Sequence, residues 1–575
     1  MSGSIFPWSN DNNCSPKASF ERNKTLPASV PATDIRKVNT VKRNNRRAAL
    51  SLVLALAATP LAIPSHAQGV LRIAMTAADI PTTTGTPNNG LEGVRFVGYP
   101  AFEGLVLWDL SKPDKPSDIR PGLAESWDQD ARNLSVWTFH LRKGVHFHDG
   151  SLFDADAVVW NMDRFLTPAA KQYEPQAAAI IRGKVPHIVS WRKVDPYTFE
   201  LTTERPISYV PYLLTQMLFA SPTQFAKVGS WTEFALHPSG TGPFRITKVV
   251  PRISVELARF DGYWDHARIA KLDGMVLYPM PEATTRLAAL RSGQVDWIEV
   301  PPPDAIPSLK AAGFQITTGI YPHIWPWIFD VSKPDSPFRD VRVRRAANYC
   351  IDRKGVVTLL NGTAKPARGF YDDTNPLFGK PTENYTYEPQ KSLKLLADAG
   401  YGAAKPVRAK IMISTAGSGQ MLPVPMNELL QQQMHECGFD ISFEVVDWGT
   451  LLVALRSAPS SPQARGANAL NVSLVSSDVS QMARFFLKQN QSPNGSNWGH
   501  WENEAFEKAF RTIEGSRSQT DIAANTTKAH EILVDDAPWL YVVHDLNARA
   551  MTSHVKGFVS ANSWFQDFTR VSMTK

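Results

Sequence analysis

The stretch Trp137-Thr-Phe-His-Leu-Arg-Lys-Gly-Val-His-Phe-His-Asp-Gly150 combines a strand pattern with a strong turn signal. Its apolar residues Trp137, Phe139 and Leu141 alternate with polar neighbours, which is the period-two pattern of a half-buried strand. The dipeptide Asp149-Gly150, at its end, is typical of a tight turn. We therefore expect a strand, a short extended continuation and a turn.

Farther along the chain, helix patterns alternate with strand patterns. Asp340 can cap a helix over 341–351, and further helix patterns cover 389–400 and 426–437. The last of these is followed by a strand pattern over 439–445. Helices and strands in this order predict an α/β fold whose lobes are built on mixed sheets.

The first 67 residues have the pattern of an export presequence. A basic region at 42–47 precedes an apolar stretch at 48–63, and Ser65-His66-Ala67 offers the small residues that a signal peptidase recognises. The apolar stretch is shorter than the about 20 residues that cross a bilayer core. We expect a signal peptide cleaved after Ala67 and a periplasmic location. A twin-arginine route, suggested by Arg46-Arg47, and a buried N-terminal helix are the alternatives.

Removing this presequence changes the charge and the size of the chain. Residues 1–67 hold nine of the 61 Lys and Arg and three of the 54 Asp and Glu, so the remaining 508 residues carry a net charge of +1. A nearly neutral chain gives no case for nucleic acid or an anionic membrane surface as a partner. Its length exceeds one hydrophobic core, so two or three domains are expected.

Two cysteines remain after the presequence, Cys350 and Cys437. Each lies on the apolar stripe of a predicted helix, where a free cysteine packs as a small hydrophobic residue. An oxidising compartment permits a disulfide between them. We expect two buried free thiols.

Seven segments of the chain match a known family in the order in which that family carries them. They are Pro121-Gly-Leu-Ala-Glu-Ser-Trp127, the stretch 137–150 quoted above, Thr241-Gly-Pro-Phe-Arg-Ile246, Phe260-Asp-Gly-Tyr-Trp264, Leu290-Arg-Ser-Gly-Gln-Val-Asp296, Pro337-Phe-Arg-Asp-Val-Arg-Val-Arg-Arg-Ala346 and Leu395-Leu-Ala-Asp-Ala-Gly-Tyr401. On these segments the chain resembles the extracytoplasmic solute-binding proteins of peptide and nickel ABC importers, the dipeptide- and oligopeptide-binding group.

The resemblance implies a two-lobed periplasmic-binding-protein fold with a hinge. Residues 68–330 would form the first lobe, with an inserted subdomain at about 108–238, and residues 331–540 the second. Residues 541–575 would return to the first lobe. Ligand binding in the cleft would then shift the lobes from open to closed.

The same resemblance implies a monomer that captures a peptide-like solute and delivers it to an ABC permease with its ATPase subunits. The sequence has no Gly-x-x-x-x-Gly-Lys-Ser/Thr loop, Gly-x-Ser-x-Gly elbow or His-Glu-x-x-His motif. We expect a binding protein with no catalytic residues and no cofactor rather than an enzyme. The alternatives are transport of an oligosaccharide, metal chelate or other solute, a periplasmic sensor or chaperone on the same fold, and a secreted hydrolase.

Asp478 stands where peptide-binding relatives carry a Trp-x-x-Asp-x-x-Asp-Pro run whose carboxylate binds the peptide's α-amino group. Here the run reads Leu474-Val-Ser-Ser-Asp478-Val-Ser-Gln-Met, without the Trp and the Asp-Pro. The resemblance implies that Asp478 binds an ammonium group. A solvated loop aspartate is the alternative.

Aromatic residues supply the other candidate contacts. They crowd the predicted hinge at 321–337, recur at 498–501, and follow the first strand near Arg95 and Phe102. Such rings could stack on a ligand, or alternate members could pack into the core. The predicted ligand-binding residues are Tyr99, Tyr321, Trp325, Trp327, Asp478, Trp498 and His500.

Two histidines of the opening stretch have a possible metal-ligand spacing. His146 and His148 lie on one strand face, but no third ligand is evident near them. We expect a structural role for this pair and no bound metal, with a metal at His500 as a minor alternative.

Overall fold

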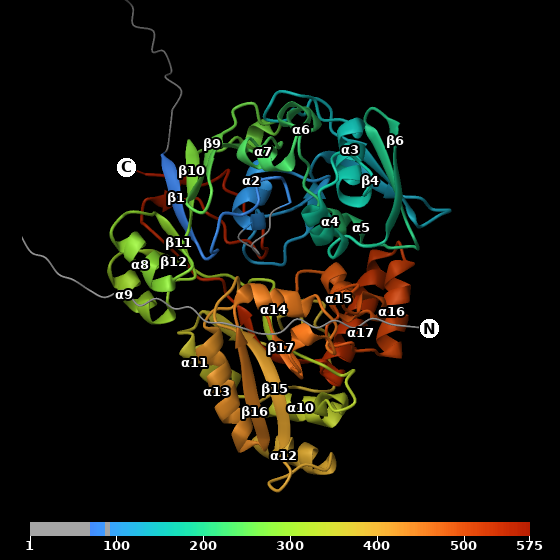
Figure 1. Cartoon of the computed structure of the whole chain (residues 1–575), viewed down its shortest axis with the longest axis vertical. Coiled ribbons are helices and arrows are strands. Elements are labelled where there is room, and N and C mark those ends of the chain that lie inside the picture. The colour runs from blue at the N-terminus through green and yellow to red at the C-terminus, as the bar shows by residue number, and fades with distance from the viewer. Residues whose placement is uncertain (1–68, 87–92, 575) are drawn as a thin grey trace, which may run out of the picture. The chain divides into compact units, whose positions relative to one another are not determined.

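Two seven-stranded mixed sheets are the centres of two lobes in the computed structural model, which describes residues 69–86 and 93–574 (Figure 1). The predicted presequence lies outside these residues. In the first sheet, β1 runs parallel to β10 and β11, and the other pairs are antiparallel. In order across the sheet, the strands are β12 (Gln315–Thr317), β20 (Arg549–Met551), β11 (Trp297–Glu299), β1 (Val70–Met75), β10 (Gly274–Pro279), β9 (Ser254–Arg259) and β8 (Phe244–Val250).

The second sheet is mixed in the same way. Strand β15 is parallel to β16 and β17, whereas β13 is antiparallel to its three neighbours. In order, the strands are β14 (Ala364–Pro366), β19 (Trp539–Asp545), β13 (His323–Phe329), β17 (Ala469–Asn471), β15 (Val407–Ser414) and β16 (Phe439–Val446), with β18 (Leu474–Val475) beside β13. The predicted strand at 439–445 is therefore confirmed as β16.

The chain crosses between the sheets twice, at 318–322 and at 546–548. The expected boundaries were 330/331 and 540/541, so both crossings differ from them by several residues. The Trp- and Pro-rich stretch expected at the hinge contains β13, whose seven residues are all buried and include both of its tryptophans. It pairs with β19 on one side and with β17 and β18 on the other, which places it inside the second lobe.

The segment expected as an inserted subdomain, 108–238, which we continue to call the inserted subdomain, contains an antiparallel sheet ordered β4-β5-β7-β6. The predicted strand is β5, where Trp137, Phe139 and Leu141 are buried and His140 is exposed. Its strands are β4 (Ala124–Gln129), β5 (Val136–Leu141), β7 (Thr198–Thr203) and β6 (Ile188–Asp195), and its helices are α3 (Ala155–Leu166), α4 (Pro175–Arg182), α5 (Val210–Leu214), α6 (Pro222–Val228) and α7 (Trp231–Leu236).

The first lobe also contains α2 (Tyr99–Ala101), α8 (Ala283–Arg291), α9 (Ile306–Ala311) and the two-stranded pairs β2 (Val106–Trp108) with β3 (Ile119–Pro121) and β21 (Val555–Lys556) with β22 (Ser572–Met573). Across 69–86 and 93–574, no helix is both long and apolar enough to span a membrane.

Helices cover both faces of the second sheet. The core on one face includes α10 and α13, and the core on the other includes α15, α16 and α17. Asp340 caps α10 by accepting from the Arg342 backbone N–H, as predicted. The helices are α10 (Val341–Cys350), α11 (Arg353–Leu359), α12 (Pro389–Asp398), α13 (Pro423–Glu436), α14 (Trp448–Leu455), α15 (Val479–Phe486), α16 (Glu504–Glu514) and α17 (Gln519–Asp536).

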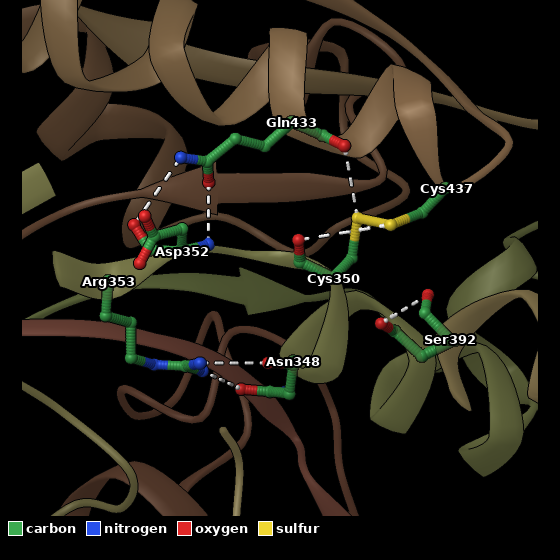
Figure 2. The surroundings of a disulfide bond; sticks show 8 residues. Asn348, Cys350, Asp352, Arg353, Ser392, Gln433 and Cys437 are labelled. Carbon is green, nitrogen blue, oxygen red and sulfur yellow. Dashed lines mark hydrogen bonds between the residues drawn. A yellow bond between two sulfur atoms is a disulfide. The ribbon is translucent and has the colours of Figure 1, made fainter. Parts of the chain in front are cut away.

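Cys350 and Cys437 form a disulfide, so the expectation of two free thiols is wrong (Figure 2). Cys350 ends α10 and Cys437 follows α13, and their Cα atoms are 6.1 Å apart, a spacing that suits a disulfide. The two apolar stripes were recognised separately in the sequence. Because both pack into one core, they bring the thiols together, which the sequence pattern did not reveal.

Candidate functional site

The inserted subdomain contacts the second lobe directly along a seam near the end of α16. Arg205 pairs with both carboxylate oxygens of Glu514, at 2.8 and 3.1 Å. The Tyr209 hydroxyl donates to the same carboxylate at 2.8 Å, and the Ser208 hydroxyl donates to the Ile513 carbonyl at 2.7 Å. One continuous apolar cluster contains residues of the inserted subdomain and of the second lobe, which we call the two bodies. The two bodies are therefore packed together in this conformation.

Asp478 caps α15 close to this seam. Its Oδ1 accepts from the Ser480 backbone N–H at 2.8 Å, and its Oδ2 accepts from the Ser477 hydroxyl at 2.5 Å. Asp478 is only 8% exposed. Burial raises the pKa of its carboxyl, whereas the hydrogen bonds from the serines lower it by less. Among the described residues, no Lys, Arg or His forms an ion pair with this carboxylate, and the largest causes of its pKa shift are burial and hydrogen bonds. Asp478 is thus a buried acid, not the solvated aspartate of the alternative interpretation.

Tyrosines of both bodies lie within electrostatic range of Asp478. Burial and then the Asp478 carboxylate raise the pKa of Tyr371, from the loop after β14. Asp478 also raises the pKa of Tyr209 and Tyr212 at the start of α5, as a smaller cause than burial. The Tyr212 hydroxyl donates to Asp118 at 2.9 Å, whereas the buried Tyr371 hydroxyl has no partner within the described residues.

The strand that leads to Asp478 is a buried two-residue strand with one strand partner in the described sheet. Within the described sheet, β18 pairs only with β13, through His323 opposite Val475 and Ile324 opposite Leu474. The Ser476 backbone N–H then donates to the Pro322 carbonyl at 2.8 Å. Asp478 therefore follows directly on a strand that adjoins the crossing between the lobes.

Three rings meet at this crossing. The ring centroids of Tyr321 and His323 are 5.4 Å apart, and those of His323 and Trp564 are 5.1 Å apart. Arg95 donates to the Tyr321 hydroxyl and pairs with Glu299 of the first sheet. Tyr321 belongs to the first-lobe core, and Trp564 packs against the cores of both lobes.

The imidazoles at the crossing are held neutral. Burial lowers the pKa of His323 to about 3, and burial also lowers the pKa of His544 on β19. The Ser473 hydroxyl lies 2.8 Å from His323 Nδ1. The buried Nε2 of His544 finds no hydrogen-bond partner in the part of the chain that the structure describes. The crossing thus combines neutral imidazoles and aromatic rings with the neighbouring Arg95–Glu299 ion pair.

Tyr99 lies elsewhere in the first lobe. Its hydroxyl accepts from the Trp108 backbone N–H at 3.1 Å, and its ring stacks on Phe565 with centroids 4.0 Å apart. It lines a cavity of about 170 Å³ together with Arg120 and Arg268. All residues that line this cavity come from the first lobe, so the structure does not bring Tyr99 together with Asp478.

The predicted tryptophans are buried in the second lobe. Trp325 and Trp327 point to the face of the sheet that α10 and α13 cover, and the Trp327 indole donates to Asn427 at 2.7 Å. Trp498 is fully buried in the core on the opposite face. This placement favours core packing for all three.

His500 lies away from the crossing. Its Nε2 is 2.8 Å from the Ser492 carbonyl, and it lines a surface hollow of about 450 Å³ with Arg344, Trp501 and Asp536. Of the seven predicted residues, Tyr321 and Asp478 lie near the crossing between the lobes, where Ser476 bonds to Pro322, whereas Trp325 and Trp327 share one face of β13 inside the core.

Sequence reasoning did not select Tyr209, Tyr212, Tyr371, His544 or Trp564. Tyr371 stands in an irregular loop, and Trp564 comes from a segment far from the other site residues in the chain. The spacing of Tyr209 and Tyr212, three residues apart at a helix start, was the one local signal.

Histidines 146 and 148 make separate contacts. His146 Nδ1 is 3.2 Å from the Gly144 carbonyl, and His148 Nε2 is 2.9 Å from the Gly242 carbonyl. Burial lowers the pKa of His148 to about 4. No group of three or more potential metal ligands is found among residues 69–86 and 93–574.

Two mixed α/β sheets joined by two crossings, with a buried acid and aromatic rings where the bodies meet, define the class of two-lobed solute-binding proteins. The family comparison makes the assignment specific. The chain belongs to the bacterial extracellular solute-binding proteins, family 5 Middle, whose model matches residues 118–494. It is therefore a transport-associated binding protein with the α/β fold of that family.

Known relatives span nearly the whole described chain. It is 26% identical over 479 residues to heme-binding protein A of Haemophilus influenzae, covering 80% of this chain and 84% of that protein. It is 25% identical over 490 residues to the periplasmic oligopeptide-binding protein OppA of Escherichia coli, covering 82% and 86%. A similar solved structure is the periplasmic binding protein DppA from Helicobacter pylori in complex with the peptide STSA. Its TM-score is 0.75 at 21% identity, covering 88% of this chain and 99% of that chain.

Proposed function

We propose that this chain is the periplasmic solute-binding component of an ABC importer, and that it captures a peptide-like solute whose ammonium group meets Asp478. The closed complex then delivers the solute to a membrane permease, whose ATPase subunits supply the energy. The similarity to peptide-binding relatives supports this direction. Within this chain, Asp478 supplies the main support.

A buried carboxylate without a cationic partner is costly. Asp478 has two serine donors and a helix N-terminus but no ion pair among the described residues. A ligand ammonium would supply the missing charge and form a charge-assisted hydrogen bond. The unpartnered Tyr371 hydroxyl, close enough to be affected by this carboxylate, offers a further polar contact.

The edge of β18 that pairs with no other described strand supports a peptide-like shape for the solute, although both residues of this strand are buried in the present conformation. An extended main chain can add to an exposed strand edge through its own N–H and C=O groups, with little demand on side-chain identity. Since Asp478 comes three residues after β18, a peptide aligned with this strand would bring its amino end near the carboxylate.

The crossing between the lobes favours a second candidate, transport of a ring-bearing solute without an ammonium group. There the half-buried ring of Trp564 lies beside the buried rings of Tyr321 and the neutral His323. Large aromatic residues supply much of the contact area in such sites. In this case Trp564 would contribute more than Asp478.

Asp478→Asn tests the proposal, because asparagine keeps the helix cap and removes the charge. A peptide selected from a di- to tetrapeptide mixture by native mass spectrometry is titrated calorimetrically, alongside its N-acetylated form. We expect both Asp478→Asn and acetylation to weaken binding by about 30-fold or more, which corresponds to about 2 kcal/mol.

Asp447→Asn is the matched control, since Asp447 caps α14 in the same way but is exposed. It should bind the peptide as the unmodified protein does. Equal affinity of Asp478→Asn and the unmodified protein for the free-amino peptide would contradict the assignment of Asp478. Selection of an aromatic solute instead of any peptide would favour the second candidate.

A further inference from the structure

The cavity that Tyr99 lines is a concave feature of the first lobe alone. Segments that are far apart in the sequence build its wall, among them residues 99–100, 108–111 and 566–568. Its volume of about 170 Å³ is room for about five water molecules at about 30 Å³ each, and therefore for a small polyatomic ion. Since none of its lining residues belongs to the second lobe, a molecule bound here is not the solute held between the lobes.

Three arginines line this cavity, and only one of them has a carboxylate partner. Arg268 pairs with Asp567 at 3.1 Å. Arg120 and Arg570 form no ion pair with any described residue, and the Arg120 guanidinium makes one hydrogen bond, to the Pro121 carbonyl at 3.3 Å. Arg120 is partly buried, whereas Arg570 is exposed. Because a guanidinium has five N–H donors, most of those of Arg120 lack an acceptor within the described chain.

The two acids that line the cavity already have donors. Asp567 Oδ1 accepts from the backbone N–H and the hydroxyl of Thr569, at 2.9 and 2.6 Å, and its Oδ2 accepts from Arg268. Asp109 Oδ1 accepts from the Ser111 backbone N–H at 3.0 Å. Three arginines against two aspartates leave the lining with one net positive charge. The charge of the cavity therefore favours an anion.

Tyr99 adds a neutral donor to the same cavity. Its side chain is buried, and burial raises the pKa of its hydroxyl, which therefore keeps its proton. The hydroxyl oxygen accepts from the Trp108 backbone N–H at 3.1 Å, but its own proton has no acceptor among the residues that the structure describes. A buried donor without an acceptor is costly. An oxygen of a bound anion would satisfy it.

We propose that this cavity is a binding site for a small oxyanion, a phosphate, sulfate or carboxylate, separate from the solute captured between the lobes. Arg120 and Arg268 present guanidinium groups, which form charge-assisted hydrogen bonds with such anions, and Tyr99 contributes its hydroxyl. The bound anion joins α2, β3 and the C-terminal segment 566–570. It thereby stabilises the packing of that segment on the first lobe.

Thermal unfolding with defined anions tests this site and does not depend on the proposed function. Melting temperature is measured against the concentration of phosphate, sulfate and succinate, with sodium chloride holding the ionic strength constant. We expect a saturable rise that follows mass action, whereas the general stabilising effect of excluded salts does not saturate. Arg120→Gln should require about tenfold more anion or higher, and Tyr99→Phe about threefold or more, because a hydrogen bond to a charged donor is the stronger of the two.

Arg252→Gln is the matched control. Arg252 lies in the turn between β8 and β9, is exposed, and has no carboxylate partner in the described part of the chain. Its response to the anions should equal that of the unmodified protein. Each variant is compared with its own anion-free melting temperature, so a loss of packing where Tyr99 stacks on Phe565 does not imitate a loss of binding.

Hydrogen exchange with and without saturating anion locates the site. We expect slower exchange over 108–120 and 566–570 and no change over 474–486, which contains Asp478. A response to phosphate and sulfate but not succinate identifies a tetrahedral anion as the ligand, and the reverse identifies a carboxylate.

Three results would each overturn the proposal. One is the absence of a saturable rise with all three anions. Another is an equal response of Arg120→Gln and Arg252→Gln. The third is slower exchange over 474–486 in place of 108–120 and 566–570, which would put the anion between the lobes.

Discussion

Arg205 of the inserted subdomain and Glu514 at the end of α16 form a two-point ion pair, with the guanidinium 25% and the carboxylate 9% exposed. The same carboxylate accepts from Tyr209, whose own pKa is affected by Asp478. The seam that joins the two bodies is therefore electrostatically linked to the candidate site. Contacts that exist only when the bodies are together bias the protein toward its closed form.

Glu514→Gln should weaken ligand binding without direct contact with the ligand. The variant loses the charge-assisted bonds to Arg205, and such bonds are each worth about 1.5–3 kcal/mol. We expect an affinity loss of about tenfold or more by calorimetry, together with a larger radius of gyration of the ligand-free protein in X-ray scattering. Glu504→Gln is the control, because it lies on the same helix in an exposed pair with Arg511. Identical behaviour of the two variants would exclude a role of the seam in closure.

As the pH falls, binding of an ammonium-bearing solute should weaken at a higher pH than it would with an aspartate of ordinary pKa. Only the carboxylate form of Asp478 attracts a cation, and burial raises the pKa of this carboxyl above the usual value of about 3.9. In the ligand-free protein, acidification has the opposite effect: it raises the free energy of unfolding. A raised folded-state pKa means that the folded protein binds the proton more tightly, so stability is gained as the pH falls through that pKa.

The check is calorimetry from about pH 7 to about pH 4, within which the loss should begin. Asp478→Asn should bind weakly and without this pH dependence, and its ligand-free form should be at least as stable at neutral pH. A decline that persists in Asp478→Asn would assign the titration to another group.

Reduction of the Cys350–Cys437 bond should destabilise the second lobe. The bond closes a loop whose ends are 87 residues apart, and the chain-entropy model gives about 4.6 kcal/mol for a loop of this size. We expect denaturant unfolding with a thiol reductant to occur at lower denaturant concentration than without it. The Cys350→Ala/Cys437→Ala variant should unfold at the lower concentration in both conditions. Insensitivity of the native protein to reductant, with the bond shown to be broken, would refute this expectation.

Trp327 and Trp564 should respond differently to truncation. Trp327 is fully buried between the second sheet and its helices, so Trp327→Ala should lower the free energy of unfolding by about 3–5 kcal/mol. Trp564 is half-buried at the crossing, so Trp564→Ala should lower affinity for a ring-bearing solute with a smaller loss of stability. Denaturant unfolding and calorimetry on both variants separate these effects. A larger affinity loss from Trp327→Ala, with its fold intact, would move the aromatic site into the second sheet.

Local pattern was sufficient to predict the regular elements. The alternation from Trp137 to Leu141 identified β5, because burial of one sheet face requires that period. The Asp340 cap identified the start of α10 for a similar reason, since the cap bond forms within one turn. Both features depend on residues that are close together in the sequence, so a single sequence is sufficient to predict them.

Contacts between distant segments could not be predicted in this way. The two cysteines lie on separately recognised helices, and only the packing of those helices on one sheet makes them partners. The positions of Trp325 and Trp327 could not be predicted for the same reason. Aromatic residues occur both in the core beneath a β-strand and in ligand clefts, so their presence does not distinguish the two. Asp478 was selected by family resemblance alone, and its surroundings came from Tyr209, Tyr212 and Tyr371 in two other parts of the chain.

The position of β1 in the first sheet has a consequence for the timing of folding. This strand lies in the interior of its sheet, yet its partners β10 and β11 begin about two hundred residues later, and β20 near the C-terminus separates β11 from β12. Pairings this distant form slowly, because a long loop must be closed before they contribute. During synthesis, the first sheet remains incomplete until residues 549–551 have emerged. A chain that stays unfolded in this way until its end is made remains suitable for threading through a narrow membrane channel.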